Sequence, residues 1–448
     1  MAKYKKYAEY QDSGAQWLGE VPNHWGVEYS KWLFEERNIK ATAHDEMLTA
    51  SQKYGVIPQK MFMELEQQKV VQVLSGHDIL KKAEANDFVI SMRSFQGGIE
   101  FSEYSGAVSS AYVPLKPREG LSLAYYKHLF KSAPYIQALQ TTTNLVRDGQ
   151  ALRYGNFIQV RIPLVPLEEA EKIGQFLDYE TAQIDSLIAK QEKLIELLKE
   201  KRQAVISHAV TKGLNPDVKM KDSGVEWLGQ VPEHWVVSLV KYQCKEITDG
   251  AHISPDLENG EHFFVSIRDI KEGIINFEDA LLTSTKSYQY LVHTGCKPFA
   301  GDILFSKDGT IGQTAITPSD IDFVVASSLI IIRPKYSKIT SEFLDLLLRS
   351  DIVQEQVESF VKGAALRRLS IQNLLKIWGV FPPIDEQRKI VEFVLYQLDK
   401  YKDLEAKAEK QVELLRERRT ALISSAVTGK IDVRNWQHPN EAKTEFGA

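Results

Sequence analysis

The amino-acid sequence predicts an α+β protein in which two mixed α/β domains are joined by two long antiparallel helices that form a coiled coil. Two observations lead to this fold. Most of the chain consists of two copies of an internal repeat, and each copy ends in a proline-free stretch with helical periodicity. The duplication gives the chain an internal pseudo-twofold repeat. We expect the first domain at residues 1–166, a central helix at 167–213, the second domain at 214–382, a distal helix at 383–430 and a tail at 431–448.

A tryptophan segment opens each copy. Asp12–Trp25 reads DSGAQWLGEVPNHW and Asp222–Trp235 reads DSGVEWLGQVPEHW, with ten of fourteen positions identical. A second repeat follows, in which Glu196–Thr211 and Glu413–Thr428 share eleven of sixteen residues. The offset between the copies exceeds 200 residues, which is too long for a solenoid. It indicates two copies of a whole domain followed by a helix.

The first part of each copy has the irregular pattern of a mixed α/β domain. Short apolar runs bounded by turn residues predict strands at Asp87–Ser91, Ile303–Phe305 and Ser328–Ile332. A helical pattern occurs at Phe343–Leu348. The two copies agree poorly in this part.

The second part of each copy, Leu167–Val210 and Ile384–Val427, contains no proline and is rich in Glu, Lys, Leu, Gln and Ala. Apolar residues recur there at three- and four-residue steps over several heptads, which is typical of long helices packed as a coiled coil. A helix of about 43 residues would be about 65 Å long. Pairing between two chains is one interpretation, but two matched helices in one chain favour intramolecular antiparallel pairing.

Composition excludes several classes of protein. The 448 residues carry 55 Lys and Arg against 60 Asp and Glu, a net charge of −5 that rules out a histone-like basic binder. Two cysteines cannot build a disulfide framework or a four-ligand zinc site. The longest apolar stretch is about ten residues, whereas a membrane helix needs about 20, and residues 1–10 hold no apolar signal core. We therefore expect a cytoplasmic protein with no membrane partner.

Four motifs of the second copy together resemble the specificity subunit of type I restriction-modification enzymes. They are GDILFSKDGTIGQTA at Gly301–Ala315, SSLIIIRP at Ser327–Pro334, LRRLSIQNL at Leu366–Leu374 and PPIDEQRKI at Pro382–Ile390. The tryptophan segment and its repeat are similar to the family's repeated opening segment. The first copy keeps only a strand-turn-strand outline, NDFVISMRSFQGGI at Asn86–Ile99, and such divergence is what recognition of two different half-sites would need.

The resemblance implies a non-catalytic, sequence-specific DNA-binding subunit. Each domain would be a target recognition domain that reads one half of a bipartite site in double-stranded DNA, with half-sites separated by roughly one helical turn. The helices would set the spacing and dock two methylation subunits, and restriction subunits would join the full complex. Methylation of adenine and ATP-driven cleavage, with S-adenosylmethionine, ATP and Mg, would belong to these partners, so this chain would bind no cofactor and no metal. The alternative is a coiled-coil scaffold without direct DNA readout.

Motifs of nucleic-acid enzymes are missing from the sequence. An adenine methyltransferase needs an Asn/Asp-Pro-Pro-aromatic motif, whereas the chain offers only Asn215-Pro216-Asp217. No G-x-x-x-x-G-K-[ST], G-x-S-x-G or H-E-x-x-H run occurs, and the ten histidines form no ligand-spaced cluster. These absences argue against a stand-alone nuclease or methyltransferase and favour a binding subunit without catalytic residues.

Loops with donors and acceptors for base edges or phosphates are the candidate DNA-binding sites. In the second domain two loops qualify, one with Lys307, Gly309, Thr310 and Gln313 and one with Asp249 and His252. The corresponding turn of the first domain offers Arg93, Ser94, Gln96 and Gly97. Candidates for phosphate contacts just before the helices are Arg147, Arg153, Arg367 and Arg368. Solvated hairpins and structural ion pairs are the alternative interpretations of these residues.

Two further sets of residues are expected to have roles other than DNA contact. The tryptophan segments, together with His24 and His234, are predicted to stabilise the fold by packing on the helices. An exposed helix face is predicted to meet partner subunits through Lys190, Lys193, Glu196 and Lys199.

The distribution of charge adds a prediction about affinity. Residues 26–150 hold 14 basic and 14 acidic residues, and residues 236–378 hold 15 and 18, so neither domain is net basic. A subunit that selects bases can leave the neutralisation of phosphates to its partners. We therefore expect the chain alone to bind DNA weakly and to need the methylation subunits for tight binding.

Overall fold

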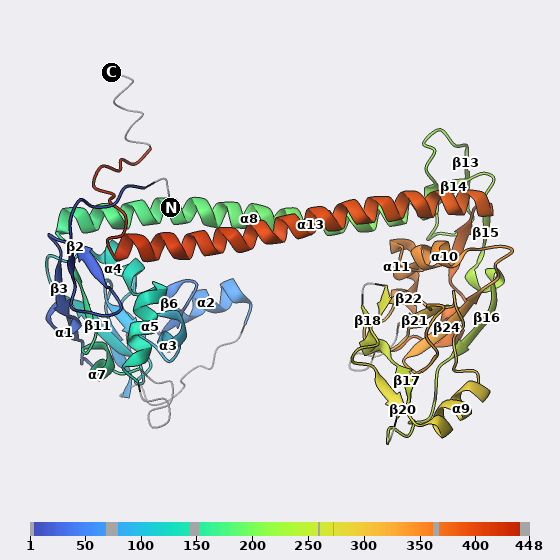
Figure 1. Ribbon diagram of the computed structural model, residues 1–448, viewed down its shortest axis with the longest axis horizontal. Helices are drawn as coiled ribbons and strands as arrows, with labels where there is room; N and C mark the ends of the chain where they lie inside the picture. Colours follow the sequence, from blue (N-terminus) through green and yellow to red (C-terminus); the bar gives the residue numbers. More distant parts are fainter. Residues whose placement is uncertain are drawn as a thin grey trace. The chain divides into compact units, whose positions relative to one another are not determined.

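The computed structural model describes residues 4–68, 79–143, 152–258, 260–271, 273–361 and 367–439. The chain folds into two compact units (Figure 1). Unit 1 comprises Met1–Gln191 and Lys410–Ala448, and unit 2 comprises Glu192–Glu409. Each unit therefore contains one globular part and a portion of both long helices, rather than one copy of the sequence repeat.

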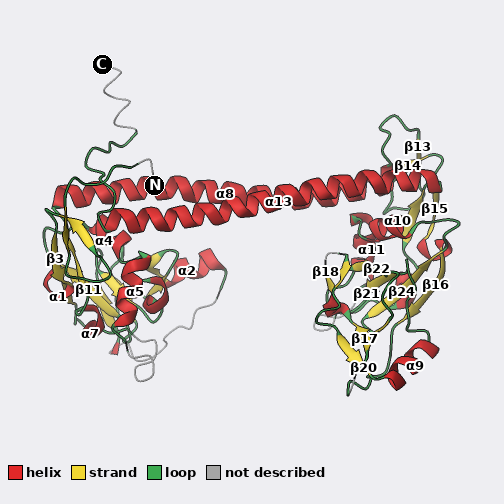
Figure 2. Ribbon diagram, viewed as in Figure 1, coloured by secondary structure: helices red, strands yellow, loops and turns green. Residues whose placement is uncertain are grey.

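Two long helices carry the periodic stretches, α8 at Leu167–Lys212 and α13 at Ile384–Val427 (Figure 2). With 46 and 44 residues, each is about 65 to 70 Å long. Acidic residues occupy both first turns, where negative charge interacts favourably with the helix dipole. Gly213 and Gly429, with φ of +79° and +71°, follow the last turns and supply the left-handed conformation that ends a helix.

The two helices pair in antiparallel fashion. In unit 1, Ile173 near the start of α8 shares a hydrophobic core with Ile423 near the end of α13. In unit 2, Val210 near the end of α8 shares a core with Ile390 near the start of α13. The start of each helix thus packs with the end of the other, and the predicted intramolecular coiled coil is confirmed.

Some of the periodic apolar side chains are exposed. Leu187, Leu194, Phe393 and Leu404 lie at positions that fit the heptad pattern, yet they are between 40% and 45% exposed. In a pair of helices only a narrow seam faces the other helix, so apolar residues beside that seam remain open to solvent. The sequence pattern therefore overstates how much of each helix is buried.

An antiparallel four-stranded sheet of the same topology lies in each unit. In unit 1 the strand order is β4-β11-β8-β9, at Phe34–Glu36, Val113–Pro117, Phe88–Ile90 and Glu100–Phe101. In unit 2 the order is β16-β24-β21-β22, at Cys244–Asp249, Leu329–Pro334, Ile303–Ser306 and Thr314–Ile316. The strands predicted from the sequence are β8, β21 and β24. The shared strand order shows that the poorly matching globular parts are copies of one fold.

Smaller elements complete unit 1. Its strand pairs are β1 (Tyr10–Asp12) with β2 (Glu20–Pro22), β3 (Gly26–Tyr29) with β12 (Arg161–Leu164), β5 (Leu48–Ser51) with β6 (Gly55–Pro58) and β7 (Lys81–Ala83) with β10 (Gly106–Val108). Its helices besides α8 and α13 are α1 (Ser30–Leu33), α2 (Gln59–Glu66), α3 (Ser94–Gly97), α4 (Leu123–Leu129), α5 (Ala133–Thr141) and α7 (Tyr154–Phe157).

Unit 2 repeats the strand pairs that flank the helices and adds a second sheet. Its pairs are β13 (Met220–Asp222) with β14 (Gln230–Pro232), β15 (Val236–Leu239) with β25 (Trp378–Phe381) and β18 (Ile270–Lys271) with β19 (Ile274–Ile275). The added sheet has the order β20-β17-β23, at Leu281–Thr283, His262–Val265 and Phe323–Val325. The helices are α9 (Thr285–His293), α10 (Ser341–Leu348), α11 (Asp351–Phe360) and α12 (Ile371–Leu374), with 3-10 turns at Val240–Gln243 and Ile267–Asp269. Helix α10 contains the predicted helical stretch.

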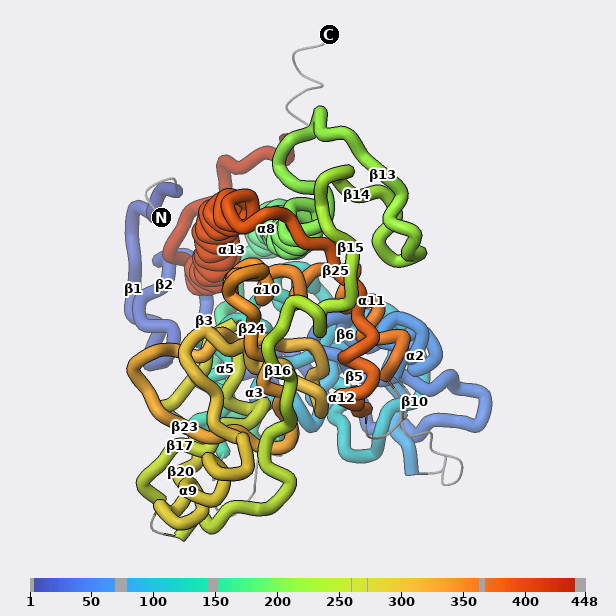
Figure 3. Tube along the Cα trace, turned by 90° about the vertical axis from the view of Figure 1, so that its right-hand side faces the viewer, coloured from blue at the N-terminus to red at the C-terminus, as the bar shows by residue number. Residues whose placement is uncertain are grey.

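Each tryptophan segment forms a hairpin beside a long helix, β1-β2 in unit 1 and β13-β14 in unit 2 (Figure 3). Trp25 is 2% exposed and Trp235 is 1% exposed. The indole Nε1 of Trp25 donates to Glu169 in the first turn of α8 at 2.9 Å, and that of Trp235 donates to Glu386 in the first turn of α13 at 3.1 Å. The predicted packing of these segments on the helices is confirmed.

A segment near the start of the described chain and a segment near its end meet in unit 1. The backbone N–H of Asp432 donates to the carbonyl of Lys5 at 2.8 Å, and the Tyr10 hydroxyl donates to the carbonyl of Gly429 at 3.1 Å. In unit 2 the corresponding stretch is continuous, because α8 passes through Gly213 directly into β13. Among the described residues, no helix is both long and apolar enough to span a membrane.

Candidate nucleic-acid interface

One edge of the unit 2 sheet bears a charged cluster made of Asp249, His252, Lys307, Asp308 and Arg368. Asp249 ends β16, Lys307 and Asp308 follow β21, and Arg368 precedes α12. Backbone contacts bring the segments together: Asp308 and Arg368 form an antiparallel β-bridge, and the N–H of Leu369 donates to the carbonyl of Lys307 at 2.9 Å. Candidates from three separate segments thus form one site.

The charges of this cluster are paired with each other. Lys307 Nζ lies 2.6 Å from Asp249 Oδ1, and His252 Nε2 lies 3.3 Å from the other carboxylate oxygen of Asp249. Arg368 makes a two-pronged contact with Asp308, with Nε to Oδ1 at 2.6 Å and Nη2 to Oδ2 at 3.0 Å. The carboxyl of Asp308 raises the pKa of Arg368. Lys307 and Arg368 are balanced by Asp249 and Asp308, so these four side chains together carry no net charge.

The loop after β21 is closed by Ser306. Its hydroxyl donates to the carbonyl of Thr310 at 2.6 Å and accepts the N–H of Gln313 at 2.8 Å. Gly309 has φ of +68° and open space around it, so its backbone conformation, and not crowding, favours glycine there. Gly309 and Thr310 are exposed and Gln313 is half-buried. The loop is therefore a rigid turn with an exposed tip, as a surface that contacts DNA would need.

The structure places Lys307 in a buried ion pair. Its side chain is 7% exposed, and its ammonium is held by Asp249, which is itself 23% exposed. A buried ammonium with a carboxylate partner is a structural group, because breaking the pair would leave a buried charge uncompensated. The Lys307 ammonium is therefore held in a structural ion pair, and a DNA contact by Lys307 stays a prediction that this burial does not favour.

The arginines before α12 lie on the surface. Arg368 is 66% exposed and Arg367 is 49% exposed. Arg367 pairs with Glu358 at the end of α11 through Nη2. The alternative interpretation of ion-paired residues thus holds for both arginines, while their exposure keeps them available to a ligand.

A hollow of about 450 Å³ lies beside the charged cluster. The last turn of α9, the end of β16 and the start of α12 line it, with Thr248, Asp249, Gly250, Ala251, His252, Ile253, Tyr290, Leu291, Thr294, Cys296 and Ile371. His252 is 70% exposed and Tyr290 is 52% exposed. A concave surface with a planar aromatic ring and polar groups suits contact with nucleotide edges. Sequence reasoning missed the contribution of α9, because nothing local to α9 indicates that it lies next to β16.

The corresponding turn of unit 1 follows β8 and continues into α3. Arg93 and Gln96 are exposed there, and Gly97 is half-buried with its carbonyl accepting from Lys131 Nζ at 3.1 Å. Ser94 is completely buried, and its hydroxyl accepts the N–H of Ser91 at 2.8 Å. This hydroxyl closes the turn from inside, and a DNA contact by Ser94 stays a prediction that its burial does not favour.

The other predicted residues are exposed or lie outside the described residues. Arg153 is exposed at the start of α7, and its backbone N–H donates to Asn156 Oδ1 at 3.0 Å. Arg147 lies outside the described residues. The four predicted partner-binding residues Lys190, Lys193, Glu196 and Lys199 are all exposed on α8. Lys193 and Glu196 form an ion pair of 2.7 Å along the helix surface.

Sequence reasoning also missed a pair of buried aspartates that support both sheets. Asp87 precedes β8 and Asp302 precedes β21, and each is 1% exposed. Asp87 binds Arg37 through Nε and Nη2 at 2.6 and 2.9 Å, and Asp302 binds Arg333 in the same way at 3.1 and 3.0 Å. The signal was present, since Asn86-Asp87 and Gly301-Asp302 stand at matching places in the two copies.

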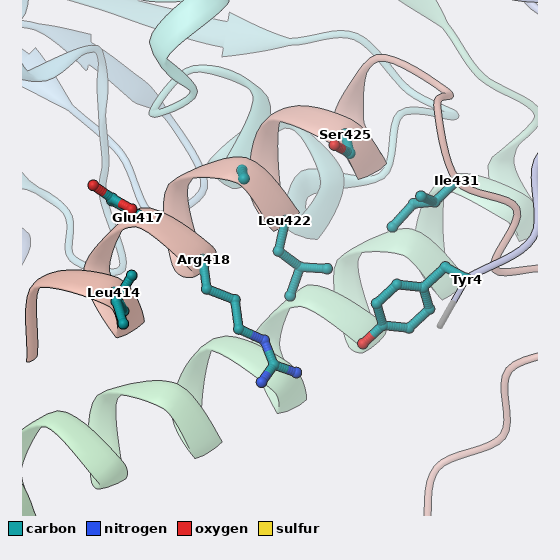
Figure 4. Close-up of a pocket in the computed structure, with 8 residues that line it drawn as sticks. Tyr4, Leu414, Glu417, Arg418, Leu422, Ser425 and Ile431 are labelled. Atoms are coloured by element: carbon teal, nitrogen blue, oxygen red, sulfur yellow. The ribbon is translucent and has the colours of Figure 1, made fainter. Parts of the chain in front are cut away.

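A second hollow, of about 560 Å³, lies in unit 1 at the end of α13 (Figure 4). Leu414, Leu422, Ile431 and Tyr4 give it a largely apolar lining, and the Arg418 side chain extends along it. None of the predicted DNA-binding residues that the structure describes lines this hollow. Among the described residues, no group of three or more His, Cys, Asp or Glu side chains is placed to hold a metal ion.

Comparisons with known proteins show what the chain is similar to. A family model described as the type I restriction modification DNA specificity domain matches residues 240–414. The chain is 26% identical over 330 residues to the type I restriction enzyme EcoBI specificity subunit of Escherichia coli, covering 70% of this chain and 68% of that protein. These matches bear out the predicted resemblance: residues 240–414 match the DNA specificity domain, and the chain is similar to a type I restriction enzyme specificity subunit.

Solved structures share the fold. One comes from work on the complex assembly and conformational transition of the type I restriction-modification system; it is 15% identical, has a TM-score of 0.67 and covers 92% of this chain and 99% of its own. The HsdS subunit from Thermoanaerobacter tengcongensis is 14% identical, has a TM-score of 0.53 and covers 92% of this chain and 98% of its own. The predicted arrangement of two mixed α/β domains and two long helices is therefore a fold that these structures share.

Proposed function

We propose that this chain supplies the sequence specificity of a type I restriction-modification complex and that each unit reads one half of a bipartite site in double-stranded DNA. The observation that carries the proposal is the repetition of one sheet topology with different loops. The turn after β21 carries Gly309 and Thr310 at its tip, whereas the turn after β8 carries Arg93 and Gln96. A common framework with two different loop sets suits a reader of two different half-sites.

The long helices would set the distance between the half-sites and dock two methylation subunits. Exposed apolar residues on both helices support this role, because apolar surface left open to water often marks a protein interface. Leu187 is 45% exposed, Leu194 is 43% exposed and Tyr396 is 67% exposed. Lys190 and Lys199 lie on the same helix as the two leucines. The half-sites would be roughly one helical turn apart, as symmetric DNA readers require.

Catalysis would reside in the partner subunits. The sequence carries neither a methyltransferase motif nor a phosphate-binding loop, so S-adenosylmethionine, ATP and Mg would be bound by the methylation and restriction subunits. The assembled complex would act on DNA in the cytoplasm. This chain would contribute the selection of the site and the framework on which the partners assemble.

Genome-wide mapping of methylated adenine tests the proposal. The chain is co-expressed with its methylation subunits in a host that lacks other adenine methylation, and a matched strain expresses the methylation subunits alone. We expect a bipartite motif with two short specific parts and a fixed spacer, present only when the chain is present. Methylation without such a motif, or the same motif without the chain, contradicts the proposal.

The salt dependence of DNA binding separates this proposal from the coiled-coil scaffold. We expect the chain alone to bind DNA weakly, because neither globular part is net basic, and the complex with methylation subunits to bind tightly. Neutralisation of several phosphates makes the logarithm of the binding constant fall steeply with the logarithm of salt concentration. If the assembled complex shows no affinity for DNA, or an affinity that does not depend on salt concentration, the result supports the coiled-coil scaffold and contradicts the proposed DNA readout.

A further inference from the structure

Asp308 holds the guanidinium of Arg368 in a fixed orientation. The contact uses two parallel hydrogen bonds of 2.6 and 3.0 Å, and a β-bridge joins the two residues through their backbones. Asp308 is 24% exposed while Arg368 is 66% exposed. The carboxylate therefore lies at the protein side of the pair, and the guanidinium extends towards solvent.

The pair leaves one donor edge of Arg368 unused. A guanidinium is planar and offers five N–H donors along two edges that can each bind a pair of acceptors. Asp308 takes the Nε–Nη2 edge. The outer edge, with Nη1 and the second hydrogen of Nη2, contacts no acceptor among the described residues.

Two other arginines show what a structural version of this pair looks like. Arg333 gives its Nε–Nη2 edge to Asp302 and its Nη1 to Glu246, and it is 19% exposed. Arg37 gives the same edge to Asp87 and its Nη1 to Glu84, and it is 10% exposed. Both arginines use Nη1 as well as the Nε–Nη2 edge for contacts within the chain, and both are less exposed than Arg368. Arg368 has the same inner contact and an exposed, unpaired outer edge.

We propose that Arg368 reads a guanine in the half-site of unit 2 and that Asp308 is the residue that positions it. The inference rests on the proposed function of unit 2 as a DNA reader. The O6 and N7 atoms of guanine form a pair of acceptors in the major groove that matches a guanidinium edge. They are also uncharged, whereas a phosphate brought to the same edge would approach the carboxylates of Asp308 and Asp249 and be repelled. The geometry thus favours a base edge over the DNA backbone.

Substitutions in the complete complex of this chain with its methylation subunits test the assignment. The methylated-adenine motif is mapped for wild type, Arg368→Lys, Asp308→Asn and the matched control Arg434→Lys. Arg434 lies in unit 1, is 48% exposed and makes the same two-pronged contact with an aspartate, Asp432. We expect Arg368→Lys to relax one G·C position in one half of the motif by about 5- to 150-fold, with the other half unchanged. Asp308→Asn should relax the same position to a smaller extent, and Arg434→Lys should leave the motif as it is.

A second measurement uses the wild-type complex and so does not depend on the folding of a variant. Duplexes carrying the wild-type motif are made with 7-deazaguanine at each guanine in turn, which removes the N7 acceptor and keeps the base pair. We expect one substitution, at the position relaxed by Arg368→Lys, to lower affinity at least several-fold.

The outcomes separate this inference from the proposed function. If wild type gives no bipartite motif, the proposed function fails. If the motif exists but Arg368→Lys leaves it unchanged and no 7-deazaguanine substitution weakens binding, Arg368 does not read guanine. An Arg368→Ala variant that lowers affinity equally for all sequences and reduces the salt slope by about one would assign Arg368 to a phosphate and likewise overturn the inference.

Discussion

Removal of the Glu169 carboxylate should destabilise unit 1 more than removal of the Glu386 carboxylate destabilises unit 2. Glu169 is 7% exposed and accepts hydrogen bonds from the Tyr7 hydroxyl at 2.6 Å and from Trp25 Nε1 at 2.9 Å. His24 Nε2 lies 2.7 Å from its other oxygen. Glu386 occupies the same place on α13 but has only Trp235 as a buried donor partner.

The magnitude follows from the donors that each substitution leaves behind. Tyr7 is 5% exposed and Trp25 is 2% exposed, so Glu169→Ala strands two buried donors. Each buried, unsatisfied donor costs about 1–3 kcal/mol, which gives about 2–6 kcal/mol for Glu169→Ala. Glu386→Ala strands one such donor, because His234 is 48% exposed and can bond to water, which gives about 1–3 kcal/mol.

Native-state hydrogen exchange of the first turns of α8 and α13 measures the two effects separately. We expect the free energy of opening to fall about twice as far at α8 in Glu169→Ala as at α13 in Glu386→Ala. Addition of Tyr7→Phe to Glu169→Ala removes one stranded donor and should recover about 1–3 kcal/mol. Equal losses at the two helices, or no recovery with Tyr7→Phe, would refute the reasoning.

Three further predictions concern unit 2. Lys307→Met should lower the free energy of opening of β21 by about 3–5 kcal/mol, because it leaves the carboxylate of Asp249 without its partner. The salt dependence of DNA binding should stay the same. Unchanged stability of β21 together with a shallower salt dependence would show that Lys307 contacts a phosphate. Burial raises the pKa of Asp345 above the ordinary 3.8, so the folded state holds this proton more tightly than the unfolded state does. The stability that this proton contributes is lost as the pH rises from about 4 upwards. The urea midpoint of Asp345→Asn should therefore fall less over this pH range than the urea midpoint of wild type. Burial raises the pKa of Cys244 to about 12, so its reactive thiolate form is scarce at about pH 8. Mass spectrometry should show that iodoacetamide alkylates Cys244 far more slowly in the folded chain than in urea. Equal alkylation rates in the two states would contradict the burial of this thiol.

The sequence predicts the framework of this protein well. The repeated tryptophan segments and the matched proline-free stretches yield two copies of a domain and two helices, and α8 and α13 begin and end within a few residues of the predicted bounds. These features are local, since heptad periodicity and proline exclusion are written into neighbouring residues. Pairing of the helices within one chain is expected because the chain contains two such helices whose sequences match.

The exposed apolar positions on the helices show where such a pattern stops being informative. Leu187 and Leu194 obey the same periodicity as Ile184, yet Ile184 is 2% exposed and the two leucines are over 40% exposed. Which of the periodic residues are buried depends on how wide the seam is and on what else packs there. That information comes from the neighbouring helix and domain rather than from the repeat.

The candidate site depends on tertiary structure for the same reason. The sequence by itself determined the duplicated architecture, the resemblance to type I specificity subunits and the loops that carry polar residues. Only the tertiary structure decided that Lys307 is buried against Asp249, 58 residues away, and that Arg368 is exposed and held by Asp308, 60 residues away. The partner of a cation is the carboxylate that the fold brings within hydrogen-bond distance of it. Because these partners are separated by about 60 residues, no local sequence pattern predicts that they lie together.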